Sequence, residues 1–342
     1  MYAVALSGGV DSAVAAYLLK QSSENVFAIF MRNWHETNGA CSSNKDLSMA
    51  TTIANQLELE LHVVDFSEQY QKEVFQDFVS DYKLGLTPNP DVLCNKNIKF
   101  KYLLNEACRL GADKLATGHY ARIDHHNGYY KLLEGLDLSK DQSYFLCALD
   151  QHQLSKACFP LGELNKFNVR QIAKELGLAN HNRKDSTGIC FIEPKHFQEF
   201  LKNYILSKPG NIIDNQGHVL GEHTGLSFYT IGQRQGLGIG GLKNSNGEPW
   251  YVAQKNMLEN TLIVCQGKNN PMLYTRQMEI SKPNFNYEGE LFVRIRHLGQ
   301  KYSCKINNCT VNFAEPVRAV TPGQYAAFYQ GQHCLGYARI LS

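Results

Sequence analysis

Short apolar runs alternate with amphipathic segments along the first half of the chain. Buried strands are expected at 4–6, 26–31, 61–66 and 114–117, and helical patterns lie at 11–20, 46–57, 70–82, 101–110 and 168–176. Strands separated by helices of about 10 to 15 residues are typical of βαβ units, which place the strands parallel and the helices on both faces. The first half of the chain therefore predicts an α/β domain with a parallel, doubly wound sheet.

The pattern changes after about residue 197. Glycines and single prolines now separate short β-rich runs, which lie at 212–213, 250–252, 261–264, 291–296 and 325–329. Such spacing predicts small β-barrels or sandwiches, and a break near 266–274 divides them in two. We expect an α/β domain over 1–196, a central β domain over 197–270 and a C-terminal, β-barrel-like domain over 271–342.

Composition supports a folded chain with an uneven charge. Of the 342 residues, 43% are hydrophobic and 19% are charged, so the chain can bury a core. Lys and Arg number 34 against 32 Asp and Glu, which argues against a histone-like polycation. Residues 1–195 hold 20 basic and 23 acidic side chains, and residues 196–342 hold 14 and 9. A phosphate-rich partner is therefore expected at the C-terminal part.

The N-terminus predicts a cytoplasmic protein. No basic residue precedes the first apolar run, and Asp11 follows it closely, so the segment does not have the pattern of a signal peptide. No stretch approaches the roughly 18 apolar residues of a membrane helix, and no membrane association is expected. In the cytoplasm the ten cysteines are expected as reduced thiols rather than as a disulfide framework.

The sequence Ser-Gly-Gly-Val-Asp-Ser, residues 7–12, lies between the first strand and the first helix. Two glycines allow a tight turn with outward amide groups, and the helix dipole adds positive charge there, which suits pyrophosphate. The chain contains no Walker A sequence. The loop resembles that of the PP-loop ATP pyrophosphatases, which form AMP and pyrophosphate. This resemblance implies that ATP, with Mg²⁺, is bound by Ala5, Leu6, Ser7, Gly8, Gly9, Val10, Asp11, Ser12, Met31 and Gly118.

Two cysteines lie in sequences that suggest chemistry. Cys94 follows two prolines, which predict a rigid loop over 87–95, and the three lysines at 96, 99 and 101 favour its thiolate. Asp91 is a candidate acid or base. Cys190 follows Gly188 and two basic residues. The alternative is that both cysteines are small buried apolar residues. A structural metal is not expected, because the Cys and His residues lack zinc spacing.

Four further sequences follow the phosphate loop in order: Pro-Asn-Pro-Asp-x-x-Cys-Asn at 88–95, Gly-His-Tyr at 118–120, Lys-Asp-Gln-Ser-Tyr-Phe-Leu at 140–146 and Asp-Ser-Thr-Gly-Ile-Cys-Phe-Ile at 185–192. With this set the chain resembles the bacterial tRNA-specific 2-thiouridylases over essentially its whole length. The resemblance implies a tRNA partner, a sulfur-donor protein and a monomeric enzyme. It also implies tRNA contacts by Asn89, Pro90, Asp91, Lys140, Asp141, Gln142, Arg296 and His297.

The resemblance implies a mechanism in two stages. ATP adenylates the C2 carbonyl oxygen of the wobble uridine, and sulfur carried by Cys190 as a persulfide then replaces that oxygen. Cys94 acts as a nucleophile, and the two cysteines end as a disulfide. Direct attack by the persulfide and release of hydrosulfide by Cys94 both remain open. The target base is expected to leave its stack to reach the strand ends.

A basic β face is expected in the C-terminal domain. Arg294, Arg296, Lys301 and Lys305 alternate along it with Tyr302 among them, and such a face can bind phosphates and stack a base. Two alternative functions stay open. Another PP-loop ligase would not need paired cysteines, and a non-catalytic RNA-binding protein would bind the nucleotide without releasing pyrophosphate.

Overall fold

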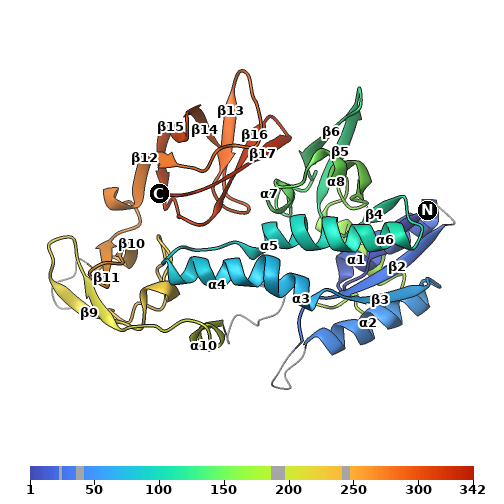
Figure 1. Ribbon diagram of the computed structural model, residues 1–342, viewed down its shortest axis with the longest axis horizontal. Coiled ribbons are helices and arrows are strands. Elements are labelled where there is room, and N and C mark those ends of the chain that lie inside the picture. Colours follow the sequence, from blue (N-terminus) through green and yellow to red (C-terminus); the bar gives the residue numbers. More distant parts are fainter. Residues whose placement is uncertain (23–24, 36–41, 186–196, 241–246) are drawn as a thin grey trace. The chain divides into compact units, whose positions relative to one another are not determined.

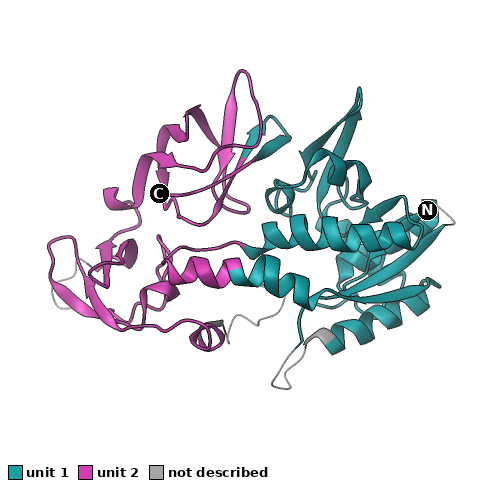
Figure 2. Cartoon of the chain, viewed as in Figure 1, with its two compact units in different colours: residues 1–76, 90–194, 328–336 teal, residues 77–89, 195–327, 337–342 magenta. Residues whose placement is uncertain are grey.

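The computed structural model describes residues 1–22, 25–35, 42–185, 197–240 and 247–342. They form two compact units (Figure 2). Unit 1 comprises Met1–Gln76, Pro90–Pro194 and Phe328–Gly336, and unit 2 comprises Asp77–Asn89, Lys195–Ala327 and Tyr337–Ser342. Since both units combine segments far apart in the sequence, they do not follow the expected division at 196 and 270, which stays a prediction.

A parallel five-stranded sheet is the centre of unit 1 (Figure 1). Its order is β3-β2-β1-β4-β7, with β1 at Tyr2–Ala5, β2 at Val26–Arg32, β3 at Leu61–Asp65, β4 at Lys114–Ala116 and β7 at Ala157–Cys158. Ala3 and Val4 point to opposite faces of β1, and both are fully buried. Both faces of the sheet are therefore covered, and the predicted α/β class is confirmed.

Helices α1 (Val10–Ser22), α2 (Ser42–Gln56) and α9 (Lys166–Glu175) cover the sheet core. Four consecutive residues of α1, from Ala13 to Ala16, are completely buried. Three of them are alanines, whose small side chains allow the helix to approach its neighbours closely. One hydrophobic core joins α1 and α2 to the central strands and to Val169 and Ala173 of α9. The start of α1 is thereby fixed against the strand ends.

A continuous helical segment replaces the rigid loop expected at 87–95. It begins with α5 (Pro90–Leu93), continues as the π-helix η2 (Cys94–Leu103) and ends with α6 (Leu104–Arg109). Pro90 is the first helical residue, where its missing N–H removes no hydrogen bond and its fixed φ suits the helix. The loop prediction was wrong from Pro90 onward because a proline in that position starts a helix. A similar segment precedes it, made of α3 (Ser67–Tyr70), η1 (Gln71–Phe75) and α4 (Gln76–Lys83).

Unit 1 also contains a β-hairpin that the hydrophobic pattern did not predict. Strands β5 (Ala121–His126) and β6 (Tyr129–Glu134) pair antiparallel around Asn127 and Gly128, which both adopt positive φ. The beginning of β17 (His333–Arg339) pairs with β6 through His333–Leu133 and Cys334–Leu132. Two short helices, α7 (Ser143–Leu146) and α8 (Gln151–Lys156), follow the hairpin.

Two groups of paired strands, most of them antiparallel, form most of unit 2. One has the order β10-β11-β8-β9, with β8 at Gly210–Ile213, β9 at Val219–His223, β10 at Trp250–Asn256 and β11 at Thr261–Gln266, and its β11–β8 pair is parallel. The other joins β12 (Tyr274–Glu279), β15 (Thr310–Arg318), β14 (Tyr302–Asn307) and β13 (Leu291–Arg294) in that order. The remaining elements are α10 (Phe197–Lys202), the turns η4 (Leu226–Phe228) and η5 (Pro271–Leu273), and β16 (Tyr325–Gln330). The β-rich second half is confirmed.

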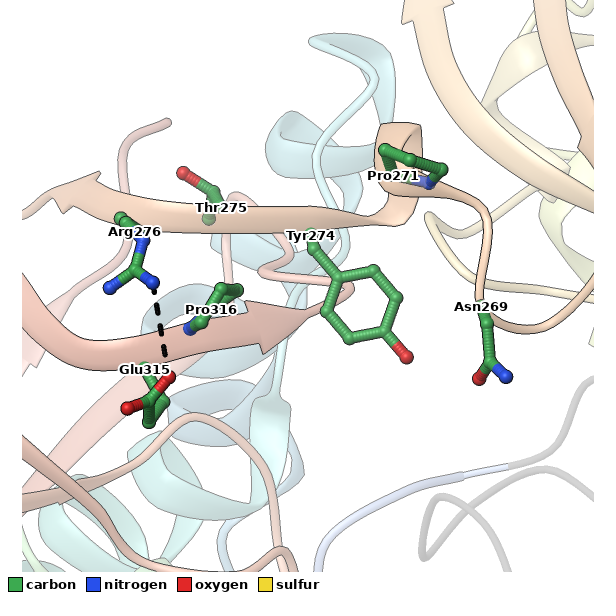
Figure 3. A pocket seen from close by; sticks show the side chains of 7 residues that line it. All are labelled: Asn269, Pro271, Tyr274, Thr275, Arg276, Glu315 and Pro316. Carbon is green, nitrogen blue, oxygen red and sulfur yellow. Dashed lines mark ion pairs between the residues drawn. The ribbon is translucent and has the colours of Figure 1, made fainter.

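Unit 2 has an open pocket of about 620 Å³ between β12 and β15 (Figure 3). The ring of Tyr274 borders it, and Arg276 Nη2 lies 3.8 Å from Glu315 Oε2. These opposite charges balance, so the pocket lacks the excess positive charge of a phosphate site. None of the helices in the described ranges has the length and apolar character to span a membrane.

Gly118 provides a test of how closely β4 and α1 approach each other. A Cβ atom at this position would lie 2.7 Å from Ser12 N and 2.8 Å from the carbonyl carbon of Asp11, both backbone atoms of α1. We expect Gly118→Ala to lower the free energy of unfolding by about 1–3 kcal/mol, measured by urea denaturation. Gly240→Ala is the control, because no atom of the described residues lies within 4 Å of its Cβ position. Equal stability of the two variants would contradict the close approach.

Candidate functional site

The candidate site lies where the strand order of the parallel sheet reverses. From β1 the chain adds β2 and β3 on one side, and β4 and β7 are added on the other. In open α/β sheets such a reversal leaves a crevice at the carboxyl ends of the two central strands. The loop of residues 6–9 follows β1, and Gly118 follows β4. The sequence had placed both segments in one site, and the structure brings them together.

Hydrogen bonds within the loop fix its backbone. Ser12 Oγ accepts from Ser7 N at 3.2 Å and donates to Gly9 O at 3.0 Å, while Ser7 Oγ accepts from Gly9 N at 3.4 Å. The hydroxyl groups of Ser7 and Ser12 also lie 3.2 Å apart. Both hydroxyl groups thus hold the turn in shape at the N-terminus of α1, where the helix dipole favours an anion.

Two glycines allow close backbone contacts around this turn. Gly8 has a φ of +78°, which favours glycine, and a Cβ there would lie 2.7 Å from Asp46 O. Gly118 has no room for a Cβ either, as its contact with α1 shows. Met31 lies near the carboxyl end of the neighbouring strand β2. The two glycines therefore let the loop pack closely against α2 and residue 118 pack closely against α1.

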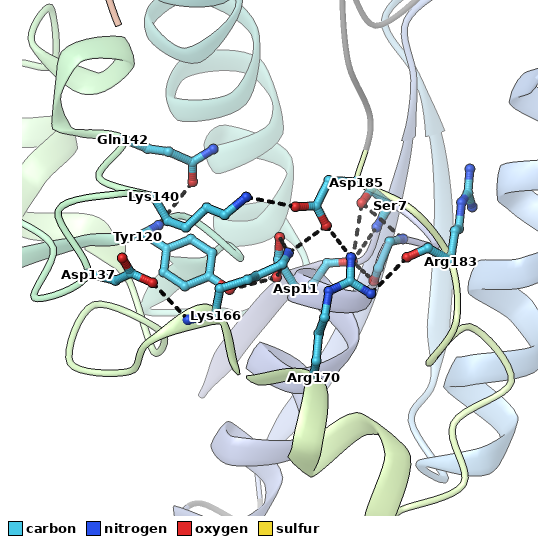
Figure 4. A network of polar contacts seen from close by, with 12 residues as sticks. Ser7, Asp11, Tyr120, Asp137, Lys140, Gln142, Lys166, Arg170, Arg183 and Asp185 are labelled. Atoms are coloured by element: carbon cyan, nitrogen blue, oxygen red, sulfur yellow. Dashed lines mark hydrogen bonds and ion pairs between the residues drawn. The ribbon is translucent and has the colours of Figure 1, made fainter. Parts of the chain in front are cut away.

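A buried lysine faces the loop from α9. Lys166 is 9% exposed, and its Nζ donates to both carboxylate oxygens of Asp11, at 2.7 and 2.8 Å (Figure 4). Tyr120, just after β4, also donates its hydroxyl to Asp11 Oδ1 at 2.8 Å. Burial and the nearby Asp11 raise the pKa of Tyr120, so its hydroxyl stays protonated. Asp11 thus connects the first turn of α1 to α9 and to the end of β4.

Three cations meet at the carboxylate of Asp185. Its Oδ1 lies 2.8 Å from Lys166 Nζ and 2.6 Å from Arg170 Nη2, and its Oδ2 lies 3.1 Å from Lys140 Nζ. Burial alone would raise the pKa of this carboxyl, but the hydrogen bonds and charges of Lys166 and Lys140 lower it to about 2. Lys166 and Arg170 approach Asp185 from α9, and Lys140 approaches it from the loop before α7 (Figure 4).

Arg183 and Asn180 both bind the backbone carbonyl oxygen of Gly8 in the loop. Asn180 Nδ2 donates to Gly8 O at 3.0 Å, and Arg183 Nη1 donates to the same oxygen at 3.2 Å. Arg183 also pairs with Asp46 of α2 at 2.5 Å. The Oδ1 atom of Asn180 is buried and has no hydrogen-bond partner among the described residues. Arg183 is one of the two basic residues that precede Cys190 in the sequence, and its guanidinium lies at the phosphate loop.

Cys94 and Asp91 lie one turn apart on the segment that starts at Pro90. Cys94 is 2% exposed, and Asp91 is half-buried. Burial raises the pKa of the Asp91 carboxyl, and the charge of Lys99 opposes the rise. Burial holds the pKa of His119 well below its usual value, and the charge of Lys99 lowers it further. His119 is therefore neutral near pH 7. His119 Nδ1 lies 2.7 Å from Thr117 Oγ1.

The three lysines after Cys94 differ in their surroundings. Lys101 pairs with Glu73 of η1 at 2.9 Å, and its Nζ lies 4.7 Å from the centre of the Tyr102 ring. Glu73 therefore neutralises much of the charge that we had expected to act on Cys94. Lys99 is the lysine whose charge reaches Asp91 and His119. Cys190 lies outside the described residues, so its expected proximity to Cys94 stays a prediction.

The residues expected to contact tRNA lie in different environments. Asp141 is fully buried and accepts hydrogen bonds from Gly135 N, Ser143 N and Ser143 Oγ at 2.9 to 3.1 Å. Its side chain therefore shapes the loop. Gln142 Oε1 accepts from Tyr120 N at 3.0 Å, and its own N–H donates to Tyr120 O at 2.8 Å.

The structure also shows the surroundings of residues 88–90, two of which were expected to contact tRNA. Pro88 and Pro90 are buried, and the half-buried Asn89 donates to Gln324 at 3.4 Å. The Oδ1 atom of Asn89 is buried, and no partner for it occurs in the described ranges.

Arg296 and His297 lie on the turn between β13 and β14. Arg296 is exposed, His297 is half-buried, and Gly299 N donates to Arg296 O at 3.1 Å to close the turn. The expected basic face was wrong in two respects. Arg294 is 6% exposed at the end of β13, and Tyr302 points away from the Lys305 side of β14, toward Phe313. Successive strand residues face opposite sides, so Tyr302 and Lys305 cannot share a face.

Lys166 and Asn180 are site residues that the sequence analysis did not find. Lys166 is the first residue of an amphipathic helix, a position that ordinarily faces solvent. Asn180 lies in a turn after α9 and carries no local signal. Among the described residues, no three His, Cys, Asp or Glu side chains gather to hold a metal ion.

A parallel sheet of this order, with a Ser-Gly-Gly-x-Asp-Ser loop after its first strand, defines a PP-loop protein of the HUP class. The family profile described as "tRNA methyl transferase HUP domain" matches residues 2–194. Two further profiles match the second half: "tRNA methyl transferase PRC-barrel domain" at 198–266 and "Aminomethyltransferase beta-barrel domain" at 272–340.

Curated relatives match nearly the whole chain. A protein of Legionella pneumophila named tRNA-specific 2-thiouridylase MnmA is 49% identical over 98% of this chain and 97% of its own length. Proteins of the same name from Ruthia magnifica and Alkaliphilus oremlandii are 50% and 48% identical, and each alignment covers 98% of this chain and 96% of the relative. The chain therefore belongs to the MnmA family of tRNA-specific 2-thiouridylases.

The lowered pKa of Asp185 predicts a pH-dependent contribution to stability. In the folded chain its pKa is about 2, below the 3.8 of an ordinary aspartate, so ionised Asp185 stabilises the fold above about pH 4. This stabilisation is lost as the pH falls toward 2. We expect the difference in unfolding free energy between the native protein and Asp185→Asn to shrink from about pH 5 to about pH 3, as measured by urea denaturation. Asp124→Asn, on the exposed hairpin, is the control. A difference that stays constant over this range would contradict the pKa shift.

Proposed function

We propose that this protein is an ATP-dependent tRNA 2-thiouridylase that replaces the C2 oxygen of the wobble uridine with sulfur. The observation that carries the proposal is the phosphate loop at the reversal point of the sheet, with four basic side chains around it. Nearly full-length relatives at about half identity, which bear the name tRNA-specific 2-thiouridylase, support the choice of substrate.

The residues of the loop fit a nucleotide. Gly8 and Gly118 allow close backbone contacts of the loop with α2 and of residue 118 with α1. The amide groups at the start of α1 can bind phosphate oxygens. The ATP site proposed here consists of Ala5 to Ser12, Met31 and Gly118. Magnesium bound with ATP would neutralise charge on the departing pyrophosphate.

The chemistry proceeds in two stages. The C2 carbonyl oxygen of uracil attacks the α-phosphorus of ATP, and the bond to pyrophosphate breaks. The terminal sulfur of a Cys190 persulfide then forms a bond to C2, and the C2–O bond breaks to release AMP. Cys94 attacks Cys190 Sγ, which leaves the sulfur on the base and joins the two cysteines in a disulfide. In the second route, Cys94 attacks first and the released hydrosulfide attacks C2. Either way an external thiol must reduce the disulfide.

Asp91 is the proposed acid or base of this reaction. Because burial raises its pKa, the carboxyl stays protonated to a higher pH than an exposed aspartate and can donate a proton when the C2–O bond breaks. Cys94, one turn further along the helix, is 2% exposed, so the surrounding residues must open before sulfur reaches it.

The proposed tRNA contacts are distributed along the chain. Asn89, Pro90 and Asp91 would contact the flipped base, and Lys140 and Gln142 would contact the tRNA beside it. Arg296 and His297 would bind the anticodon region from their turn. Asp141, being fully buried, would act by shaping the loop between Lys140 and Gln142. A sulfur-donor protein would load Cys190, and the proposed enzyme acts as a monomer.

The cysteine assignments predict a specific loss of thiolation. With ATP, Mg²⁺, unmodified tRNA and a persulfide donor, we expect 2-thiouridine at the wobble position in digested tRNA, detected by mass spectrometry. Cys94→Ala and Cys190→Ala should each lower its yield about 100-fold or more, because each removes a sulfur that forms a bond in the reaction. Cys108→Ala is the control, since Cys108 is exposed on α6. Thiolation at the native rate by both variants would contradict the roles assigned to the two cysteines. If the native protein forms AMP and pyrophosphate but no 2-thiouridine, another PP-loop ligase becomes the better description.

The position of Arg296 predicts an effect on tRNA alone. Arg296→Ala removes an exposed guanidinium from the β13–β14 turn, so tRNA affinity should fall roughly threefold to tenfold, with a shallower salt dependence. ATP affinity without tRNA should stay unchanged. Fluorescence anisotropy and calorimetry measure the two, with Arg109→Ala, an exposed arginine of α6, as the control. Unchanged tRNA affinity for Arg296→Ala would contradict the assigned contact.

A further inference from the structure

Asp185 occupies a position that an anionic ligand would suit. Its two carboxylate oxygens contact Lys166, Arg170 and Lys140 at 2.6 to 3.1 Å. An ordinary surface ion pair joins one cation to one anion, whereas this carboxylate contacts three cations, two from α9 and one from the loop before α7. Its side chain is 35% exposed, so solvent and ligands can reach it.

Two of the three cations, Lys166 and Arg170, are connected to the phosphate loop as well as to Asp185. Lys166 joins Asp185 to Asp11 in the first turn of α1. Arg170, one turn further along α9, also donates to Arg183 O at 3.1 Å, and Arg183 binds Gly8 O. Lys166 and Arg170 therefore lie beside the phosphate loop, where phosphate groups bound at the start of α1 would meet positive charge (Figure 4).

Positive and negative charges both lie around this position. Lys140, Lys166 and Arg170 carry three positive charges, and the two carboxylates in contact with them, Asp11 and Asp185, carry two negative charges. The N-termini of α1 and α9 add further positive potential. A third carboxylate, Asp137, accepts a hydrogen bond from Lys166 N at 2.9 Å and interacts with the charge of Lys140. Displacement of Asp185 would leave one more positive charge uncompensated at this position, which favours an incoming anion.

We propose that Asp185 is an internal substitute for phosphate: it holds Lys140, Lys166 and Arg170 in place, and the β- and γ-phosphates of the nucleotide displace it from these cations. This inference rests on the proposed function, because it assigns the position of the pyrophosphate leaving group. Asp185 would therefore lower the affinity of the protein for the nucleotide, whereas residues that bind the nucleotide directly raise it.

The sign of one affinity change tests the proposal. Asp185→Asn removes the competing charge but keeps the shape of the side chain, so inorganic pyrophosphate should bind about tenfold more tightly. Lys166→Met should weaken the same binding by about tenfold. Isothermal titration calorimetry without metal measures both effects, and Asp124→Asn on the exposed hairpin is the control. Asp185→Ser is a second variant in case Asp185→Asn does not fold, and circular dichroism checks each fold.

Three results would overturn the proposal. Unchanged or weaker binding of pyrophosphate by both Asp185 variants would show that this carboxylate does not compete with phosphate. Weaker binding of ATP only in the presence of Mg²⁺ would instead make Asp185 a magnesium ligand. Tighter binding by Asp124→Asn as well would indicate a general charge effect.

The outcome is separable from that of the proposed function, because the titration uses neither tRNA nor sulfur. Tighter binding without any thiolation would support the displacement and reject the 2-thiouridylase. Thiolation of tRNA without a change in pyrophosphate affinity would support the 2-thiouridylase and reject the displacement of Asp185.

Discussion

The ammonium group of Lys166 is the interaction on which the candidate site depends. It contacts Asp11 of the phosphate loop and Asp185 beyond α9, and Asp11 in turn accepts from Tyr120 at the end of β4. A nearly buried ammonium is costly to desolvate unless carboxylates surround it, and here two do. Three segments that are distant in the sequence are therefore fixed to one another by a single charge. The network makes the phosphate loop part of a rigid frame before any ligand enters.

The helix from Pro90 to Arg109 has a different role from this frame. It begins at a proline, changes to π-type hydrogen bonding at Cys94 and returns to an α-helix at Leu104. π-Helical turns are rare and are frequent at functional sites, since they widen the helix at the cost of less regular hydrogen bonds. The cysteine is thereby held in a buried helical turn rather than on a loop. Burial of Cys94 limits the access of other molecules to its thiol.

The sequence predicted those parts of the fold and site that depend on local pattern. Apolar runs such as 26–31 are strands because both faces of the sheet are buried, and the glycines of the phosphate loop mark a turn by their own geometry. Lys166 and Asn180 could not be found in this way, because their roles come from tertiary contacts with Asp11 and Gly8. The hairpin β5–β6 was missed because its exposed residues include charged and histidine side chains instead of an apolar alternation. The loop prediction at Pro90 was wrong because a sequence alone does not distinguish a proline at the start of a helix from a proline in a loop.

The segment Phe328–Gly336 belongs to unit 1 although it lies close to the C-terminus. Cys334 pairs with Leu132 of β6, Glu134 N donates to Gln332 O at 3.0 Å, and the hydroxyl of Tyr329 lies 3.1 Å from Ser143 Oγ. During synthesis on the ribosome, the first 300 residues therefore emerge before unit 1 can close. Until then the edge of the hairpin stays unpaired and open to association with other strands. The β5–β6 hairpin of unit 1 therefore gains its partner strand only after the last segment of the chain has been made, so an N-terminal fragment ending before Phe328 lacks part of unit 1.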